Sequence, residues 1–283
     1  MCGTPCQRSN GLLQSCDKWS VGPLPPLFVH PSNGAAMTAM PPPSRRPSRR
    51  RILGAAMAVP PALILGAQTA RAASWGTPVT VNSWNKINAR WTANNELQTY
   101  RPDCVWYEGN TLVIKAFNAG GGVYYSGRVE STARYGYGTY SFTANMPNGR
   151  GLLPAVWAAY LNPWLPEFDA AEIVGQNPGV VYQTSHDVNN VQQQFSRTNS
   201  SGWTNSYHRY SFSWFPDHID FAVDGVITGT TWYRTPAGTG LRFIANIAVG
   251  GDWPGNPDSS TWATADGARY LKISSITHTP YNP

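Results

Sequence analysis

Residues 166–175 read Pro-Glu-Phe-Asp-Ala-Ala-Glu-Ile-Val-Gly and place three carboxylates, Glu167, Asp169 and Glu172, within six positions. Side chains alternate between the two faces of a β-strand, so Glu167 and Asp169 share a face and Glu172 should point the other way. A β-bulge at Ala170 and Ala171, whose small side chains tolerate the distortion, would return Glu172 to the face of the other two. The spacing therefore predicts a bulged strand with all three carboxylates on one face.

Two such carboxyl groups can cleave a glycosidic bond. About four strand steps of ~3.3 Å separate the backbones of the two glutamates, and each side chain can lean inward by roughly 4 Å, so the carboxyl groups could approach to about 5 Å. That separation suits a retaining mechanism, in which an ionised carboxylate attacks the anomeric carbon while the other carboxyl protonates the leaving oxygen. We interpret Glu167 as the nucleophile, Asp169 as its hydrogen-bonding partner and Glu172 as the general acid/base. From this motif alone, an exposed acidic strand or a calcium site fits equally well.

The formal charge of +6 is unevenly distributed along the 283 residues. Residues 1–74 hold 8 Lys/Arg and 1 Asp, whereas residues 75–283 hold 13 Lys/Arg and 14 Asp/Glu, which gives +7 and −1 for the two parts. A basic chain often binds nucleic acid or anionic surfaces. Here the excess charge lies in a segment that we expect to be removed, so we expect no nucleic-acid binding.

That segment has the pattern of an export signal. Arg49 and Arg50 precede an apolar run that ends at Ala67 and includes Pro60 and Pro61, and Ala70-Arg71-Ala72 has the small-x-small form of a signal-peptidase site. Paired arginines are typical of twin-arginine export. The run is shorter than the roughly 20 residues that cross a bilayer as a helix, so we expect no stable membrane insertion, with an uncleaved anchor as the alternative. We therefore expect a leader over residues 1–73, whose true start could be Met37 or Met40, and a secreted domain over residues 74–283.

The expected domain contains a single cysteine, Cys104, so it can form no internal disulfide and must depend on its core. We expect Cys104 to be buried as a small apolar residue. Short runs rich in β-branched and aromatic residues, punctuated by Gly, Pro and Asn, indicate an all-β chain. Many antiparallel strands without a fixed repeat favour a jelly-roll sandwich of two curved sheets, whose concave face would form a groove. The expected strands are 111–117, 127–133, 138–145, 155–160, 168–174, 180–186, 207–215, 218–223 and 241–249.

Several segments beyond the acidic triplet resemble glycoside hydrolase family 16, the β-jelly-roll endoglycanases that include laminarinases, lichenases, agarases and carrageenases. The resemblance covers nearly all of residues 74–283, and it is specific because the segments occur together in the family's order. The resembling segments are Asn94-Asn95-Glu96-Leu97-Gln98-Thr99-Tyr100, Tyr125-Ser126-Gly127-Arg128-Val129, residues 150–157, the triplet, residues 207–225 and residues 246–255.

The resemblance implies a polysaccharide substrate. The triplet with one extra residue is similar to that of laminarinases, agarases and carrageenases, and Gly250-Gly251-Asp252-Trp253-Pro254-Gly255 looks most like a laminarinase loop. Cleavage of a β-1,3-linked glucan is therefore expected, with a galactan hydrolase or a transglycosylase on the same fold as alternatives. A non-catalytic carbohydrate-binding jelly roll is a further alternative, although it would not need the carboxylates.

Four further residues are candidates for binding substrate. Trp157 and Trp253 could stack on sugar rings, because Trp157 matches the family's cleft residue and Trp253 lies on a loop framed by Gly and Pro. Arg128 could hydrogen-bond sugar hydroxyls or pair with Glu130, and the resemblance favours the groove. His186 ends the strand after the triplet, where it could contact the catalytic residues or serve structure. Trp164 is left open between the groove and structure.

No cofactor is expected. Metal-binding cysteine and histidine spacings are absent from the sequence. Many members of the resembled family carry a structural calcium held by an Asp of the last strand, but the matching residue is Lys272, so no metal is predicted. The expected partner is the polysaccharide substrate, and we expect a monomer.

Overall fold

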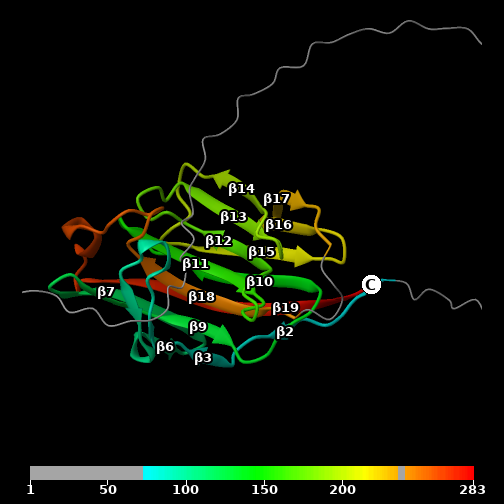
Figure 1. Cartoon of the computed structure of the whole chain (residues 1–283), viewed down its shortest axis with the longest axis horizontal. Coiled ribbons are helices and arrows are strands. Elements are labelled where there is room, and N and C mark those ends of the chain that lie inside the picture. The colour runs from blue at the N-terminus through cyan, green and yellow to red at the C-terminus, as the bar shows by residue number, and fades with distance from the viewer. Residues whose placement is uncertain (1–72, 235–239) are drawn as a thin grey trace, which may run out of the picture. The chain divides into compact units, whose positions relative to one another are not determined.

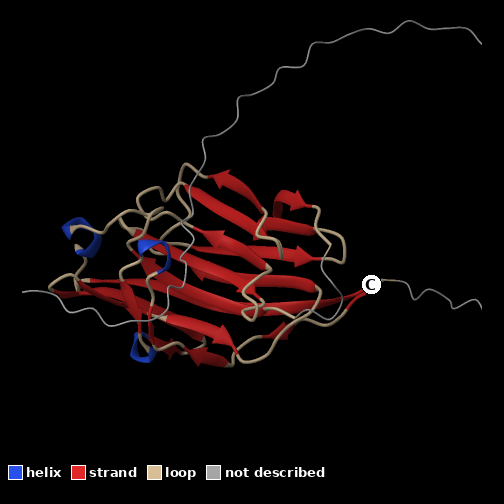
Figure 2. Cartoon of the chain, in the orientation of Figure 1, coloured by secondary structure: helices blue, strands red, loops and turns tan. Residues whose placement is uncertain are grey.

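The computed structural model describes residues 73–234 and 240–283. The predicted leader, apart from Ala73, lies outside the described residues. The regular structure of the described residues is strand, apart from three short 3₁₀ helices, and loops join the strands, as Figures 1 and 2 show. Within this part of the chain, helices that are long and apolar enough to cross a bilayer do not occur. The 3₁₀ helices are η1 (Ala93–Asn95), η2 (Pro102–Cys104) and η3 (Ser259–Trp262).

The strands form two sheets. The larger has 12 strands, and its main path runs β17-β16-β15-β10-β19-β7-β8-β5-β4, with β1 and β2 paired to β19 and β6 paired to β7. In chain order these strands are β1 (Ser74–Trp75), β2 (Val79–Thr80), β4 (Ala89–Arg90), β5 (Gln98–Tyr100), β6 (Val105–Glu108), β7 (Thr111–Gly120), β8 (Val123–Ser126), β10 (Gly138–Asn145), β15 (Tyr207–Trp214), β16 (Ile219–Val223), β17 (Val226–Thr231) and β19 (Ala268–Asn282).

The smaller sheet has 7 strands in the order β14-β13-β12-β11-β18-β9-β3, and the same order is visible in Figure 1. All of its neighbouring strands are antiparallel. Its members are β3 (Trp84–Lys86), β9 (Arg128–Ser131), β11 (Leu152–Ala159), β12 (Glu167–Glu172), β13 (Val180–His186), β14 (Gln192–Thr198) and β18 (Arg242–Val249).

The hydrophobic core lies between the two sheets. In β10 burial alternates strictly, so Tyr140 and Phe142 point inward while their neighbours do not. Tyr140 of the larger sheet stacks on Phe243 of the smaller sheet, with ring centroids 4.6 Å apart. Phe168 of β12 meets Phe212 of β15 at 5.5 Å. These contacts bury one face of each sheet and leave the other face of the smaller sheet open for a site.

The predicted all-β jelly roll is confirmed, and most expected strands occur within a few residues of their predicted bounds. Strand β12 begins at Glu167 and ends at Glu172, so the prediction of 168–174 was displaced toward the C-terminus. Strands β1 to β6, β8, β14, β17 and β19 lie outside the predicted ranges. Cys104 is buried, as expected, and burial raises its pKa to about 11.

Candidate active site

The catalytic candidates lie on β12, a strand of the smaller sheet with a neighbour on each side. Opposite β11, Ala171 pairs with Val156 and Asp169 with Trp157, so Ala170 has no partner of its own. Ala170 and Ala171 are consecutive, yet both are fully buried in the core. The predicted bulge is therefore confirmed, and it turns Glu172 to the same face as Glu167 and Asp169.

Each carboxylate belongs to a row of side chains that crosses the sheet, because residues paired in register share a face. The three rows are parallel to one another and perpendicular to the strands. One contains Ala159, Glu167, His186 and Gln192; the next contains Trp157, Asp169, Thr184 and Gln194; the third contains Ala155, Glu172, Tyr182 and Ser196.

Two cavities of about 350 and 430 Å³ lie on this face. The first lies over β9, β18 and β11, and the second extends over β13 and β14 to Trp253. Both are lined by Asn94, Glu167, Asp169 and Glu172. The three carboxylates therefore lie where the two cavities adjoin, in a groove that runs across the strands.

Indole rings surround Arg128 in the first cavity. The guanidinium carbon lies 5.1 Å from the ring centre of Trp91, 5.0 Å from that of Trp157 and 5.4 Å from that of Trp164. Arg128 is only 4% exposed and also donates hydrogen bonds to Glu130, at 2.8 Å from Nη2 and 3.1 Å from Nε. Both expectations for Arg128 thus describe its surroundings: it lines the cavity and pairs with Glu130.

Polar side chains under this cavity are fixed by hydrogen bonds. Trp157 donates from Nε1 to Asn246 Oδ1 at 2.8 Å, and Asn246 donates to the Tyr100 hydroxyl at 3.1 Å. On the same side, Gln98 donates to Glu96 at 2.5 Å. Burial raises the pKa of Glu96, which is a fourth carboxyl group in the cavity wall.

Sequence reasoning did not select Trp91, Glu96, Tyr100 or Asn246 as site residues. Glu96 and Tyr100 lie in residues 94–100 and Asn246 lies in residues 246–255, two of the segments that marked the family resemblance, so a signal was present. Trp91 carried none, because an isolated tryptophan is more often part of a core.

The surroundings of the three carboxyl groups raise their pKa values and so favour the protonated forms. Burial, reinforced by the charges of Glu167 and Glu96, raises the pKa of Glu172 to about 8. Burial, with the charges of Glu172 and Glu167, raises the pKa of Asp169 well above its ordinary value. These groups titrate as one cluster, so at neutral pH the cluster retains protons.

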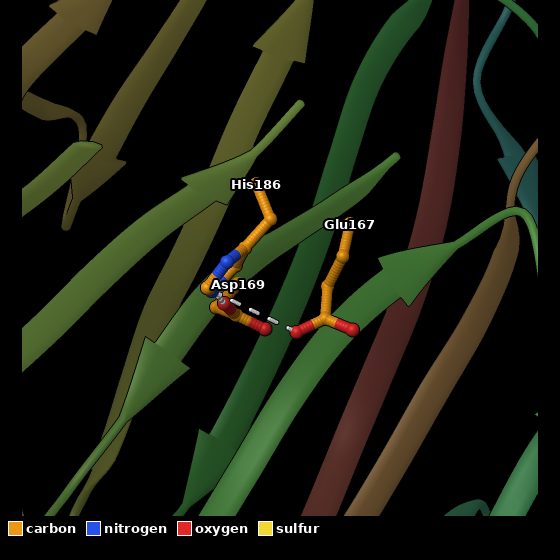
Figure 3. A group of neighbouring side chains, drawn as sticks. All are labelled: Glu167, Asp169 and His186. Carbon is orange, nitrogen blue, oxygen red and sulfur yellow. Dashed lines mark ion pairs between the residues drawn. The ribbon is translucent and has the colours of Figure 1, made fainter. Parts of the chain in front are cut away.

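Glu167 differs from the other two because partners favour its ionised form. Burial raises its pKa, but nearby His186, the Trp164 hydrogen bond and Arg128 act in the opposite direction. Trp164 donates its indole N–H to Glu167. His186 Nε2 lies 4.0 Å from Glu167 Oε1 and 4.0 Å from Asp169 Oδ2, and Figure 3 shows the three side chains converging. Of the three carboxylates, Glu167 is thus the one best supported as an anion.

Ligand-type atoms of Glu167, Asp169 and His186 all lie within 4.8 Å of one another. Two of these residues belong to the carboxylate triplet, and one carboxylate oxygen of Glu167 already accepts a hydrogen bond from Trp164. We therefore assign the group to acid-base chemistry. At the position where family resemblance implies a calcium ligand, Lys272 donates to Glu108 at 3.2 Å, and a lysine ammonium does not fit a cation site.

Trp253 lies on the wall of the second cavity and is 41% exposed. Gly250 and Gly251 adopt φ values of 73° and 115°, which favour glycine, and thereby turn the chain toward the groove. The indole packs edge-on against Tyr182 of β13, with ring centroids 5.0 Å apart. The loop thus holds an indole against the second cavity, opposite the aromatic wall of the first.

Comparison with known proteins agrees with this geometry. The family model for glycosyl hydrolases family 16 matches residues 84–274. The chain is 28% identical over 250 residues to glucan endo-1,3-beta-glucosidase A1 of Niallia circulans, covering 70% of this chain and 36% of that protein. It is 30% identical over 196 residues to a beta-glucanase of Rhodothermus marinus, covering 57% of this chain and 67% of that protein.

Among solved structures, the catalytic domain of an endo-1,3-beta-glucanase (laminarinase) from Thermotoga petrophila is similar, with a TM-score of 0.65 and 22% identity. The alignment covers 74% of this chain and 99% of that domain. At this identity the likeness establishes the fold, including the two-sheet arrangement on which the groove depends. Together with the family match over most of the described residues, it leads to one conclusion: the chain belongs to glycosyl hydrolases family 16.

Proposed function

We propose that the chain is a secreted endoglycosidase that cleaves β-1,3-glucan with retention of anomeric configuration. The observation that carries the proposal is the position of Glu167, Asp169 and Glu172 at the junction of two cavities. A polysaccharide bound along the groove can extend in both directions from the cleaved bond, as an endo-acting enzyme requires.

In the first step Glu167, as the anion, attacks the anomeric carbon and forms a glycosyl-enzyme ester while the bond to the leaving oxygen breaks. Glu172, whose raised pKa of about 8 keeps it protonated at neutral pH, gives its proton to that oxygen. Burial and the neighbouring carboxylates raise the pKa of Asp169, and in its protonated form it can donate a hydrogen bond within the cluster. The leaving sugar departs with a free hydroxyl group.

In the second step Glu172, now ionised, accepts a proton from water as the water oxygen attacks the anomeric carbon. The ester bond to Glu167 breaks, which restores both carboxyl groups to their starting states. Two inversions at the same carbon give net retention.

Charge distribution in the groove favours a neutral polysaccharide over a sulfated one. Four carboxyl groups line the cavities, whereas Arg128 is paired with Glu130. Gln192 and Gln194 add neutral amides to the second cavity, which suit sugar hydroxyls. Sulfate groups would meet the ionised Glu167, so a carrageenan-type substrate is disfavoured. The similarity to proteins named as 1,3-beta-glucanases supports the β-1,3 linkage.

Export through the twin-arginine route is part of the proposal and rests on Arg49, Arg50 and the Ala70-Arg71-Ala72 site. These residues lie outside the part of the chain that the structure describes.

The test is a product profile on laminarin, mixed-linkage glucan, agarose and carrageenan, with the anomer of the first products read by NMR. We expect rapid loss of laminarin chain length, oligosaccharide products and initial β-anomers. Initial α-anomers would refute the double displacement, and release of monosaccharides alone would refute endo action. Products longer than the starting oligosaccharide would show that sugar, instead of water, resolves the intermediate.

A further inference from the structure

Gln183 of β13 is a polar side chain buried in the core between the two sheets. Tyr182 and Thr184, on either side of it, lie in the rows of the carboxylates and face the groove. Side chains alternate along a strand, so Gln183 points the other way, and it is only 1% exposed. An amide in an apolar core is costly unless it is hydrogen-bonded. Its hydrogen bonds therefore show which parts of the core Gln183 joins.

The amide nitrogen of Gln183 bonds to the bulge of β12, the strand that carries the three carboxylates. Nε2 donates to the carbonyl oxygen of Ala170 at 2.6 Å. Ala170 is the residue of β12 that has no partner in register in either β11 or β13. A side chain thus supplies a hydrogen bond at the position where the bulge interrupts the backbone ladder.

The same amide also contacts the larger sheet. Nε2 lies 3.2 Å from the carbonyl oxygen of Ala222 in β16 and 3.4 Å from that of Ser211 in β15. The Thr228 hydroxyl of β17 donates to Gln183 Oε1. Thr228 is itself the extra residue where the register of β17 with β16 shifts. One side chain therefore connects a bulge of the smaller sheet with a bulge of the larger sheet, across the core.

We propose that Gln183 is a positioning residue for the general acid/base: its bond to the Ala170 carbonyl fixes the bulge of β12, and the bulge fixes the direction of Glu172. The roles of Glu172 as acid/base and of Glu167 as nucleophile rest on the proposed function.

The bulge determines the position of Glu172 more than that of Glu167. Glu172 follows Ala171 directly, whereas Glu167 lies at the other end of β12. Without the amide, the buried Ala170 carbonyl loses this donor, so the backbone of the bulge moves to recover a partner. That movement displaces Glu172 and leaves Glu167 in place. A displacement of about 1 Å can cost roughly a hundredfold in rate.

The first test is Gln183→Met, which keeps the length of the side chain and removes the amide. We expect kcat/KM on laminarin to fall by about tenfold to a hundredfold, because proton transfer to the leaving oxygen depends on the position of Glu172. A dinitrophenyl glycoside of a laminari-oligosaccharide needs no proton on its leaving group, so its kcat/KM should stay within about threefold of the parent value. Thr228→Val, which removes the donor to Gln183 Oε1, should show a smaller loss of the same kind.

Azide gives a readout that a loss of stability cannot produce. Hydrolysis of the glycosyl-enzyme needs Glu172 as a base for water, so Gln183→Met should accumulate this intermediate on the dinitrophenyl glycoside. Azide needs no base, and it should raise kcat of the variant several-fold and give the β-glycosyl azide. The parent should gain little, because its Glu172 already activates water.

The matched control is Tyr210→Phe in β15, a strand of the larger sheet. It also removes a buried side-chain bond to a main-chain carbonyl, in this case from the Tyr210 hydroxyl to Trp203 at 2.9 Å. Its Tm should fall, while its rates on both substrates, per folded molecule, should match those of the parent. The proposal is overturned if Gln183→Met keeps the parental rate on laminarin, loses rate equally on both substrates, or gains nothing from azide.

A crystal structure of Gln183→Met tests the proposal without any substrate. We expect Ala170 and Glu172 to be displaced relative to the parent and Glu167 to keep its parental position. An unmoved Glu172 refutes the proposal even if the variant is inactive. If Gln183→Met does not fold, Thr228→Val takes its place in each measurement. A parent that cleaves no glycan would refute the proposed function instead, and the displacement of Glu172 would still decide the role of Gln183.

Discussion

Trp164 donates its indole N–H to Oε2 of Glu167, three residues further along the chain, so the groove wall contacts the proposed nucleophile directly. The same ring lies 5.6 Å from Trp157 and 5.8 Å from Trp91. The sequence left open whether Trp164 belongs to the groove. In the structure Trp164 lies in the wall of the first cavity.

Replacing Trp164 with Phe removes this donor and retains an aromatic ring. The hydrogen bond lowers the pKa of Glu167, so its loss raises that pKa. Activity requires ionised Glu167, and the acidic limb of the kcat/KM profile should therefore move to higher pH. A hydrogen bond to a charged group is worth about 1.5–3 kcal/mol, so a fall in kcat/KM of about tenfold or more is expected. Trp262→Phe, outside both cavities, is the control, and an unshifted acidic limb in Trp164→Phe would contradict the assignment.

Glu167→Ala and Glu172→Ala should each lose at least about a hundredfold in kcat on laminarin while the fold survives, since both side chains face the groove. Azide distinguishes their roles on an activated aryl β-glycoside. In Glu167→Ala, azide replaces the nucleophile and gives the α-glycosyl azide; in Glu172→Ala, it attacks the glycosyl-enzyme and gives the β-glycosyl azide. NMR identifies the anomers. The same anomer from both variants would contradict the two roles, and exchanged anomers would reverse them.

Trp253→Ala should affect long substrates more than short ones. Loss of a stacking indole costs about 1–3 kcal/mol, or roughly 5-fold to 150-fold in kcat/KM, for chains that reach it. Oligomers too short to reach it should be nearly unaffected, because remote binding energy is available only to substrates that make the contact. Trp232→Ala, at a 74% exposed indole that lines neither cavity, is the control. Equal losses at all lengths together with a lower Tm would show that Trp253 serves structure.

Protonation of Glu172 links the active site to stability. Its pKa is about 8 in the folded protein against 4.5 for an ordinary glutamate, so the folded state binds more protons between these pH values. The contribution of this group to stability is therefore present below about pH 4.5 and is lost as the pH rises toward 8. Glu172→Gln cannot ionise, and its Tm should exceed that of the parent by several degrees at pH 8 but not at pH 4.5.

The control for that experiment is Glu108→Gln. Lys272 lowers the pKa of Glu108, so the amide should give no gain in Tm at pH 8. A Glu172→Gln Tm that follows the parent at every pH would mean that Glu172 ionises normally in the folded protein.

The secreted protein should begin near Ala73 or Ser74, and replacing both Arg49 and Arg50 with Lys should block its export. N-terminal sequencing of secreted material measures the first, and immunoblots of cell and medium fractions measure the second. Secreted protein that retains residues 1–40 would disprove the cleavage site.

The fold and the triplet were predictable because each had a local signal. Six residues with three carboxylates and two alanines were sufficient to infer the bulge, since alternation along a strand is strict and one extra residue reverses it. Strand β14 was not predicted because Gln192, Gln193 and Gln194 break the apolar alternation at an exposed edge of the sheet.

The rest of the site depends on contacts between residues distant in sequence. Arg128 of β9 meets Trp157 of β11 only because β9, β18 and β11 are neighbours, and Trp91 and Trp164 reach it from the segments after β4 and before β12. His186 lies beside Glu167 and Asp169 only through the register of β12 with β13. Strand order and register are set by packing of the whole domain, and short-range patterns do not specify them.

Selection or engineering could change two different parts of the groove: the rows of side chains that hold the carboxylates, or the ends of the groove. The spacing of Glu167 and Glu172 is set by backbone pairing inside the sheet, on a strand that has a partner along each edge. Towards its ends the groove is formed by a loop and by the edge strand β14, which contribute Trp253 and two glutamines. Substitution libraries confined to those ends should alter which glycan is accepted while leaving the bond-breaking geometry intact, so new specificities are accessible without rebuilding the catalytic centre.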